Sequence, residues 1–103
     1  MALTIDCRMI EGEGCWEIKL AGEVDIASAA KFRAALTESY DSRPADVRLD
    51  ASELCYIDST GLGVIIGAYG RMQANSHSIR IENPRANVEK LLHITSLDKI
   101  FCS

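Results

Sequence analysis

Apolar and polar residues alternate in several short segments of the chain, which is the pattern of half-buried β-strands. The predicted strands cover residues 3–10, 15–20, 47–50 and 77–82. The first two flank a Glu-Gly-Glu-Gly turn at 11–14 and therefore predict an antiparallel hairpin whose second strand ends near Gly22. The apolar segment 54–57 follows an irregular link at 51–53, so the third strand is expected to end at Asp50.

Between these strands, apolar residues recur at steps of three and four, which is typical of helices. Asp25 can cap a helix that runs from about Ile26 to Tyr40. The apolar face of this helix contains Ala29, Phe32, Leu36 and Tyr40. The strongest helical pattern covers residues 62–72 and follows three residues that can cap a helix, so a second helix is expected to begin at about Ser59.

Two short helices complete the predicted order. Residues 87–93 carry one apolar stripe, and Thr95 with Asp98 resembles a capping box at the start of another helix. The order β-β-α-β-α-β-α-α predicts an α/β fold with a small mixed sheet of about four strands faced by helices. Crossover helices join parallel strands, so at least one strand pair is parallel. No linker or repeat interrupts residues 1–103, and we expect them to form a single domain.

The predicted central helix has three glycines on one face, Gly63, Gly67 and Gly70. Each glycine inside a helix costs about 0.5–1 kcal/mol relative to alanine. Such a stripe suggests that the sheet, a neighbouring helix or a partner protein approaches the backbone closely, and tight packing on the sheet is the expected cause. Apolar residues surround most of this helix, so we expect it to be largely buried or partly covered by a partner.

The composition is that of a folded globular protein, with 48% hydrophobic and 25% charged residues. The 11 basic and 15 acidic side chains give a net charge of −4, and no basic stripe favours nucleic acid as a partner. No apolar run approaches the roughly 20 residues of a membrane-spanning helix, so no membrane association is expected. The N-terminus lacks the basic region of a secretion signal, and we therefore expect a cytoplasmic protein.

The chain has four cysteines, Cys7, Cys15, Cys55 and Cys102. None of them forms a Cys-x-x-Cys pair, and a four-residue hairpin turn places Ile18, not Cys15, opposite Cys7. We expect reduced thiols that behave as small buried hydrophobic residues. A redox or metal-binding role is the alternative interpretation.

Two enzyme classes share single elements with this sequence. Ser59 follows Asp58, but the flanking residues are not the Gly-x-Ser-x-Gly turn of many hydrolases. The only histidines that could serve as a base, His77 and His93, are expected to be ordinary surface or boundary residues. The glycines at 61, 63 and 67 resemble a dinucleotide-binding turn, but the last spacing has one residue too many. The sequence therefore predicts neither an enzyme nor a bound cofactor.

Four carboxylates could suggest a cation site, namely Glu23, Asp25, Asp50 and Asp58. The first two suit a turn and a helix cap, and Asp50 ends the predicted third strand. We therefore expect no metal site.

The segment 58–63, Asp-Ser-Thr-Gly-Leu-Gly, places hydroxyl groups at the start of the predicted central helix. Free backbone N–H groups and the positive end of the helix dipole stabilise an anion at this place. The fold can therefore tolerate a phosphate on Ser59 or Thr60, while the phosphate changes the surface that a partner meets. The segment is a candidate switch.

This segment, together with several others, resembles the STAS domains of bacterial anti-sigma factor antagonists. The matching segments are residues 20–25, 47–50, 56–64, 83–84 and 91–101. The resemblance implies a small mixed sheet with helices packed mainly on one face, in agreement with the order of elements above.

The resemblance also implies a regulatory function in transcription signalling. Members of this kind bind, when unphosphorylated, an anti-sigma factor that resembles histidine-kinase ATPases, and so release the sigma factor. The same partner phosphorylates the serine after the motif aspartate, here Ser59, and a metal-dependent PP2C-type phosphatase reverses the reaction. The expected partner-binding residues are Glu23, Asp25, Asp58, Ser59, Thr60, Gly61 and Leu62.

Two alternatives stay open at this point. A similar STAS regulator can act on a secretion, biofilm or stress-sensing pathway instead of a sigma factor. The second alternative is a constitutive binding module in which Ser59 is never modified.

Overall fold

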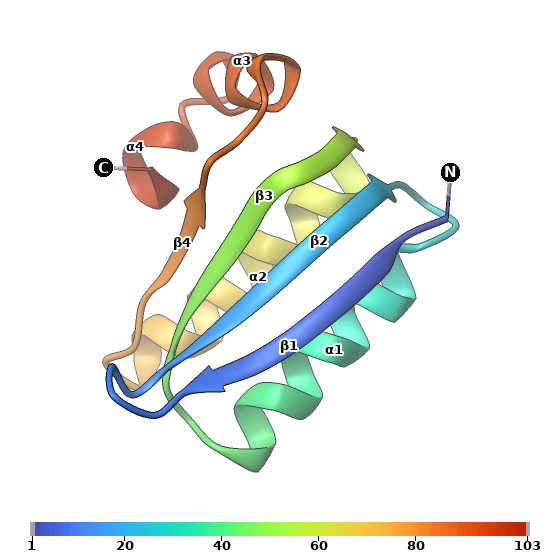
Figure 1. Cartoon of the computed structure of the whole chain (residues 1–103). Coiled ribbons are helices and arrows are strands. Elements are labelled where there is room, and N and C mark those ends of the chain that lie inside the picture. Colours follow the sequence, from blue (N-terminus) through green and yellow to red (C-terminus); the bar gives the residue numbers. More distant parts are fainter. Residues whose placement is uncertain (1, 103) are drawn as a thin grey trace.

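The computed structural model describes residues 2–102, so Met1 and Ser103, the two ends of the predicted domain, lie outside the described residues. The predicted order β-β-α-β-α-β-α-α is confirmed (Figure 1). The elements are β1 (Thr4–Ile10), β2 (Cys15–Val24), α1 (Ala29–Ser42), β3 (Asp46–Ile57), α2 (Ser59–Ala74), β4 (Ile79–Glu82), α3 (Ala86–Ile94) and α4 (Asp98–Phe101).

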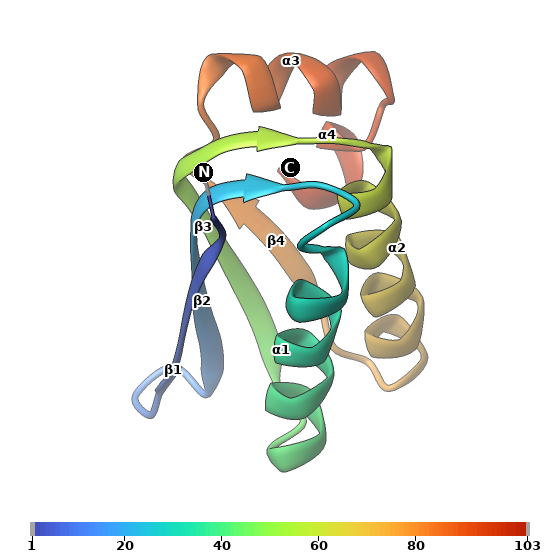
Figure 2. The same ribbon diagram turned by 90° about the vertical axis from the view of Figure 1, so that its right-hand side faces the viewer.

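The strands form one mixed sheet in the order β1-β2-β3-β4. β1 and β2 pair antiparallel across the hairpin, whereas β2 with β3 and β3 with β4 pair parallel. The parallel pairs follow from the crossover helices α1 and α2, which cover the same face of the sheet (Figure 2). α3 packs against β3, and α4 packs against β4. The predicted α/β fold with helices mainly on one face is therefore confirmed.

The β1–β2 hairpin has the predicted register, with Cys7 opposite Ile18. The backbone N–H groups of Glu13 and Gly14 close the turn by donating to the Ile10 carbonyl oxygen at 3.1 and 2.8 Å. Gly14 has a φ of 63°, a left-handed conformation that glycine adopts without strain. The turn sequence and the observed pairing of the two strands therefore agree.

The predicted break in the third strand is wrong, because β3 is continuous over Asp46–Ile57. Ser52 and Glu53 are both exposed, which interrupts the alternation of buried and exposed positions. The pairing of β2 with β3 shifts register near these residues, so a bulge absorbs the irregularity without ending the strand. Asp50 lies within the strand, where its Oδ1 accepts a hydrogen bond from the Ser52 N–H at 3.0 Å.

The first helix begins at Ala29, three residues later than predicted, and residues 26–28 form a turn before it. Asp25 Oδ1 accepts hydrogen bonds from the N–H groups of Ala27 and Ser28 at 3.0 and 3.1 Å. Asp25 therefore caps this turn and not the helix itself. The predicted apolar face of the helix is confirmed by the burial of Ala29, Phe32, Leu36 and Tyr40.

The predicted capping box before the last helix is wrong. Thr95 Oγ1 donates to the carbonyl oxygens of Leu91 and Leu92 at 3.0 and 3.1 Å, so this hydroxyl closes the end of α3. Asp98 begins α4, and its carboxylate lies 3.1 Å from His93 Nδ1. The two residues of the supposed box therefore serve two different elements.

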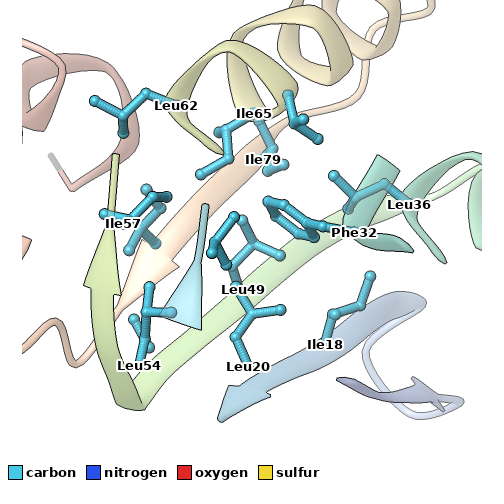
Figure 3. Packing of buried hydrophobic residues seen from close by; sticks show 14 of the residues in the cluster. Ile18, Leu20, Phe32, Leu36, Leu49, Leu54, Ile57, Leu62, Ile65 and Ile79 are labelled. Atoms are coloured by element: carbon cyan, nitrogen blue, oxygen red, sulfur yellow. The ribbon is translucent and has the colours of Figure 1, made fainter. Parts of the chain in front are cut away.

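The buried side chains form one cluster between the sheet and the helices (Figure 3). Phe32 of α1 is directed toward Leu49 of β3, and Ile65 of α2 lies beside Ile79 of β4 (Figure 3). Ile79 and Ile81 are buried, as predicted for β4, although this strand begins two residues after His77. Burying one such side chain fully contributes about 1.5–3 kcal/mol, so α2 is held to the sheet mainly by packing.

The four cysteines are free thiols, but only Cys15 is buried. Cys55 is partly buried, and Cys7 and Cys102 are exposed, so the prediction of four buried hydrophobic cysteines is wrong. Cys7 lies on an edge strand and Cys102 follows the last helix, where an apolar pattern does not guarantee cover. Loss of solvation raises the pKa of the Cys15 and Cys102 thiols.

Tight packing of the glycine stripe on the sheet, expected from the sequence, is not observed. A Cβ atom at any of its three glycines would meet no described atom within 4 Å outside the helix backbone nearby. The close approach occurs instead at Gly61, where a Cβ atom would lie 2.6 Å from Val24 Cγ1 and 2.7 Å from Ile57 Cγ1. Gly61 therefore lets the first turn of α2 rest on the ends of β2 and β3.

This contact predicts opposite effects at two neighbouring glycines of α2. We expect Gly61→Ala to lower the free energy of unfolding by about 1–3 kcal/mol, the usual cost of overpacking. Gly63→Ala is the matched control, and we expect it to raise the free energy of unfolding by about 0.5–1 kcal/mol. Urea denaturation of both variants measures the difference. Equal changes in stability would contradict a tight contact at Gly61.

Candidate functional site

The carboxyl ends of β2 and β3 lie side by side. Val24 pairs with Ile57, and the Asp58 N–H donates to the Val24 carbonyl oxygen at 3.2 Å. Asp25 follows β2 and Asp58 follows β3, so these two acidic residues leave neighbouring strands. In open α/β sheets, functional residues gather beyond the carboxyl ends of the strands.

Asp58 is the N-cap residue of α2, with the extended backbone that this position requires. Its Oδ1 accepts a hydrogen bond from the Gly61 N–H at 3.1 Å, and its carbonyl oxygen accepts one from the Leu62 N–H at 3.0 Å. The carboxylate of Asp58 is thus directed to the backbone of the first helical turn. This arrangement fixes the start of α2 at the place that the sequence predicted.

Ser59 is the first residue of α2, and its side chain is exposed. The first turn of α2 contains no acidic side chain, and the carboxylate of the N-cap residue Asp58 faces the positive end of the helix dipole. The Ser59 hydroxyl thus lies at the N-terminal end of the helix on an exposed side chain. This geometry can accept an anion without displacing a buried side chain.

The predicted partner-binding residues lie around this helix start, but they differ in exposure. Glu23, Asp25, Asp58 and Thr60 are partly buried, and Ser59 is exposed. Gly61 and Leu62 are buried, with Leu62 only 5% exposed. Their side of the helix packs on the strand ends, so they position Ser59 and do not themselves present a surface to a partner.

Three large apolar side chains near these strand ends are exposed, and they are not among the site residues predicted from the sequence. Ile26 is 81% exposed, Tyr56 is 47% exposed and Ile66 is 46% exposed. Tyr56 pairs with Glu23 in the parallel register, and Ile66 follows Ser59 by two turns of α2. Helical spacing could have identified Ile66. Strand alternation does not mark Tyr56, because a register shift separates it from the buried Leu54. No sequence signal marks Ile26.

The histidines do not give Ser59 a catalytic base. Tyr40 Oη and His77 Nδ1 lie 2.5 Å apart, at the far end of the 16-residue helix α2. A helix of that length spans about 24 Å. His93 is paired with Asp98 in the C-terminal helices. The arrangement of a Ser-His-Asp triad is therefore not assembled around Ser59.

The carboxylates at the strand ends serve the backbone. Asp25 and Asp58 each accept hydrogen bonds from N–H groups of the following turn. Within residues 2–102, no group of three or more His, Cys, Asp or Glu side chains is arranged to hold a metal ion.

Comparison with known proteins gives a family for this fold and sequence. The family model described as "Mlab, STAS domain" matches residues 7–102. The anti-sigma-B factor antagonist of Bacillus subtilis is 31% identical over 100 residues, which cover 97% of this chain and 89% of that protein.

Solved structures of similar proteins share the fold. An anti-sigma factor antagonist from Mycobacterium paratuberculosis aligns with a TM-score of 0.81 and 20% identity, covering 97% of this chain and 83% of that one. The anti-sigma factor antagonist SpoIIAA in its unphosphorylated form aligns with a TM-score of 0.72 and 20% identity, covering 87% of this chain and 82% of that one. The phosphorylated form of Bacillus SpoIIAA gives a TM-score of 0.72 and 19% identity over 97% of this chain and 88% of that one.

None of the helices within residues 2–102 has the length and apolar character needed to cross a membrane. The names of the similar proteins describe regulators that act against another protein, and not enzymes. The family model covers nearly the whole chain, and the Bacillus subtilis relative aligns over almost the same extent. The chain belongs to the STAS-domain family of anti-sigma factor antagonists.

Proposed function

We propose that this protein is an anti-sigma factor antagonist whose binding to its partner is switched by phosphorylation of Ser59. The observation that carries the proposal is the exposed Ser59 side chain at the first position of α2. The similarity to the anti-sigma-B factor antagonist of Bacillus subtilis supports the class of partner. In the unphosphorylated form, the protein binds an anti-sigma factor and thereby frees the sigma factor.

The proposed partner is an anti-sigma factor of the histidine-kinase-like ATPase type that is also the serine kinase. A PP2C-type phosphatase removes the phosphate and restores binding. The docking surface centres on Ser59 and extends to the turn after β2, which carries Asp25. Glu23 on the neighbouring strand end adds a second carboxylate that can meet basic residues of the partner.

Phosphate acts in this proposal through charge and size at the docking surface. It adds about −1.5 to −2 charges next to Asp58, where a partner surface is fitted to a neutral hydroxyl. The N-terminal end of α2 favours the anion by roughly 0.3–1 kcal/mol, so the fold itself accepts the modification. Support comes from SpoIIAA, a structural neighbour that has been solved in both unphosphorylated and phosphorylated forms.

Within this proposal, the first prediction concerns the modified residue. Incubation of the protein with ATP and its cognate kinase is expected to add one phosphate to Ser59, since this hydroxyl is exposed at the helix start. Intact mass followed by peptide mapping measures the number and position of phosphates. Ser59→Ala is the control and is expected to remain unmodified. Phosphate confined to Thr60, Ser52 or Ser96 would contradict the assignment.

The second prediction separates binding from folding. Ser59→Ala is expected to bind the anti-sigma factor like the unphosphorylated protein, and Ser59→Asp is expected to bind it more weakly. Both variants should retain their stability within about 1 kcal/mol, the scale of one helix-terminal interaction. Calorimetric titration with the partner and urea denaturation give the two quantities. Equal affinities of the wild type and Ser59→Asp would contradict an electrostatic switch.

The phosphorylated wild type allows a direct test of conformational change. Because α2 is packed on the sheet, changes in the amide spectrum should be confined to about residues 56–63 and should fade with distance from Ser59. Shifts of the amides in β4 or in the terminal helix would mean that the switch rearranges the core.

The third prediction tests the charge of the turn after β2. Asp25→Asn keeps an Oδ1 acceptor for the N–H groups of Ala27 and Ser28, so the turn should persist. We expect the affinity for the anti-sigma factor to fall by about 1 kcal/mol, or roughly fivefold. Asp6→Asn on the exposed strand β1 is the matched control and should leave the affinity unchanged. Unchanged binding by Asp25→Asn would place the charged contact elsewhere.

A further inference from the structure

A groove of about 310 Å³ lies between α1 and α2, which run side by side (Figure 2). Its floor is apolar and recessed between the helices, and it is formed by Leu36, Tyr40, Val64 and Met72. These side chains are at most 5% exposed to solvent. The volume falls at the lower end of the range of about 300–1,000 Å³ that is usual for small-molecule sites.

Glycines of α2 keep this groove open. Gly63 and Gly67 line it, and a Cβ atom on either residue would meet no described atom within 4 Å outside the nearby helix backbone. Larger side chains at these positions would project into the free space. Each of these glycines lowers the stability of the helix by about 0.5–1 kcal/mol relative to alanine. No side chain or strand within residues 2–102 packs closely against their backbone.

The rim of the groove is basic. Arg33 of α1 lines it, is exposed, and has no hydrogen-bond or ion-pair partner among residues 2–102. Arg71 of α2 lies on the same rim, pairs with Asp41, and places its guanidinium carbon 5.0 Å from the centre of the Tyr40 ring. Arg33 therefore carries the positive charge that is available to a ligand, while Arg71 is already engaged.

We propose that this groove binds a small amphipathic carboxylate. Its apolar body lies against the recessed floor and the bare backbone of Gly63 and Gly67. Its carboxylate accepts charge-assisted hydrogen bonds from the Arg33 guanidinium, and Thr37, one turn further along α1, offers a hydroxyl donor at the same rim. Ser59 does not line the groove, which begins one turn further along α2 at Gly63, and the proposal does not depend on the proposed switch.

The shape of the groove favours a small ligand over a segment of a protein partner. A stable protein interface buries about 800 Å² on each partner. The apolar floor is recessed below the two helices, so a helix resting on them would touch the rim and leave most of the floor uncovered. A narrow molecule with one anionic end can reach both the floor and Arg33.

Decanoate is a suitable probe, with decylamine as the control of equal length and opposite charge. Decanoate below its micelle concentration should shift the amide signals of residues 63–68, and a titration of these shifts gives the dissociation constant. Decylamine should bind at least about tenfold more weakly, a difference of about 1.4 kcal/mol, because Arg33 repels it.

Three variants assign the binding to this groove. Gly67→Leu fills the free space and should weaken decanoate binding by about tenfold or more, and Arg33→Gln should weaken it by about three- to tenfold. Gly70 lies on the same helix but outside the groove lining, so the Gly70→Leu variant should bind decanoate like the wild type. Circular dichroism of the variants checks that each one folds.

Several outcomes would overturn the proposal. Absence of any decanoate-induced shift at residues 63–68 would do so. Equal binding of decanoate and decylamine, or undiminished binding by Gly67→Leu, would show a non-specific apolar contact. Binding of an acidic helical peptide at residues 63–68, with no effect of decanoate, would assign the groove to a protein partner instead.

Discussion

The first turn of α2 rests directly on the side chains of Val24 and Ile57 at the ends of β2 and β3, because the residue at the contact, Gly61, has no side chain of its own. The hydrogen bond from the Asp58 N–H to the Val24 carbonyl oxygen and the Asp58 cap on Gly61 act at the same place. Three constraints therefore determine where the helix begins and in which direction it leaves the sheet. The exposure of Ser59 follows from them, since the side of the helix that faces the core is already occupied by Leu62.

The two sides of α2 have different roles. One side carries Leu62, Val64 and Ile65 into the common core, and removal of one such buried side chain typically costs about 2–5 kcal/mol. The other side carries Ser59, Ile66 and open glycine backbone on a surface that solvent reaches. The proposed phosphate adds about one to two units of charge at the exposed side, and we expect the packed side to stay unchanged.

The sequence predicts best those features that depend on neighbours in the chain. The four-residue turn defines the hairpin register, and the Asp58-Ser59-Thr60 run marks the start of α2, since caps and turns are local. The family resemblance rests on the same local segments. Features that depend on distant contacts are predicted less well.

In the sequence, the bulge in β3 looks like the end of a strand at Ser52 and Glu53, because the bulge arises from the pairing with β2. Four glycines of α2 look alike in sequence, yet only Gly61 meets the sheet, and sequence spacing cannot show which side of the helix is covered. Asp25 is a cap in the structure, as the sequence predicts. The turn that it closes depends also on Ser28, whose hydroxyl donates a hydrogen bond to the Glu23 carbonyl oxygen. The residues of the helix start were thus predictable as a group, while their division into supporting and accessible residues needed the fold.

Because Ser59 lies within a helical turn, other proteins meet its hydroxyl on a defined backbone conformation. Its backbone is already helical, and the Asp58 carboxylate accepts a hydrogen bond from the Gly61 N–H, so the proposed kinase would meet a folded helical turn and not an extended peptide. A short synthetic peptide with the same residues lacks the β2 and β3 ends that give the turn its form. In the proposed switch, signalling through Ser59 would therefore depend on the folded state of the chain, because an unfolded copy would not present this turn to the kinase.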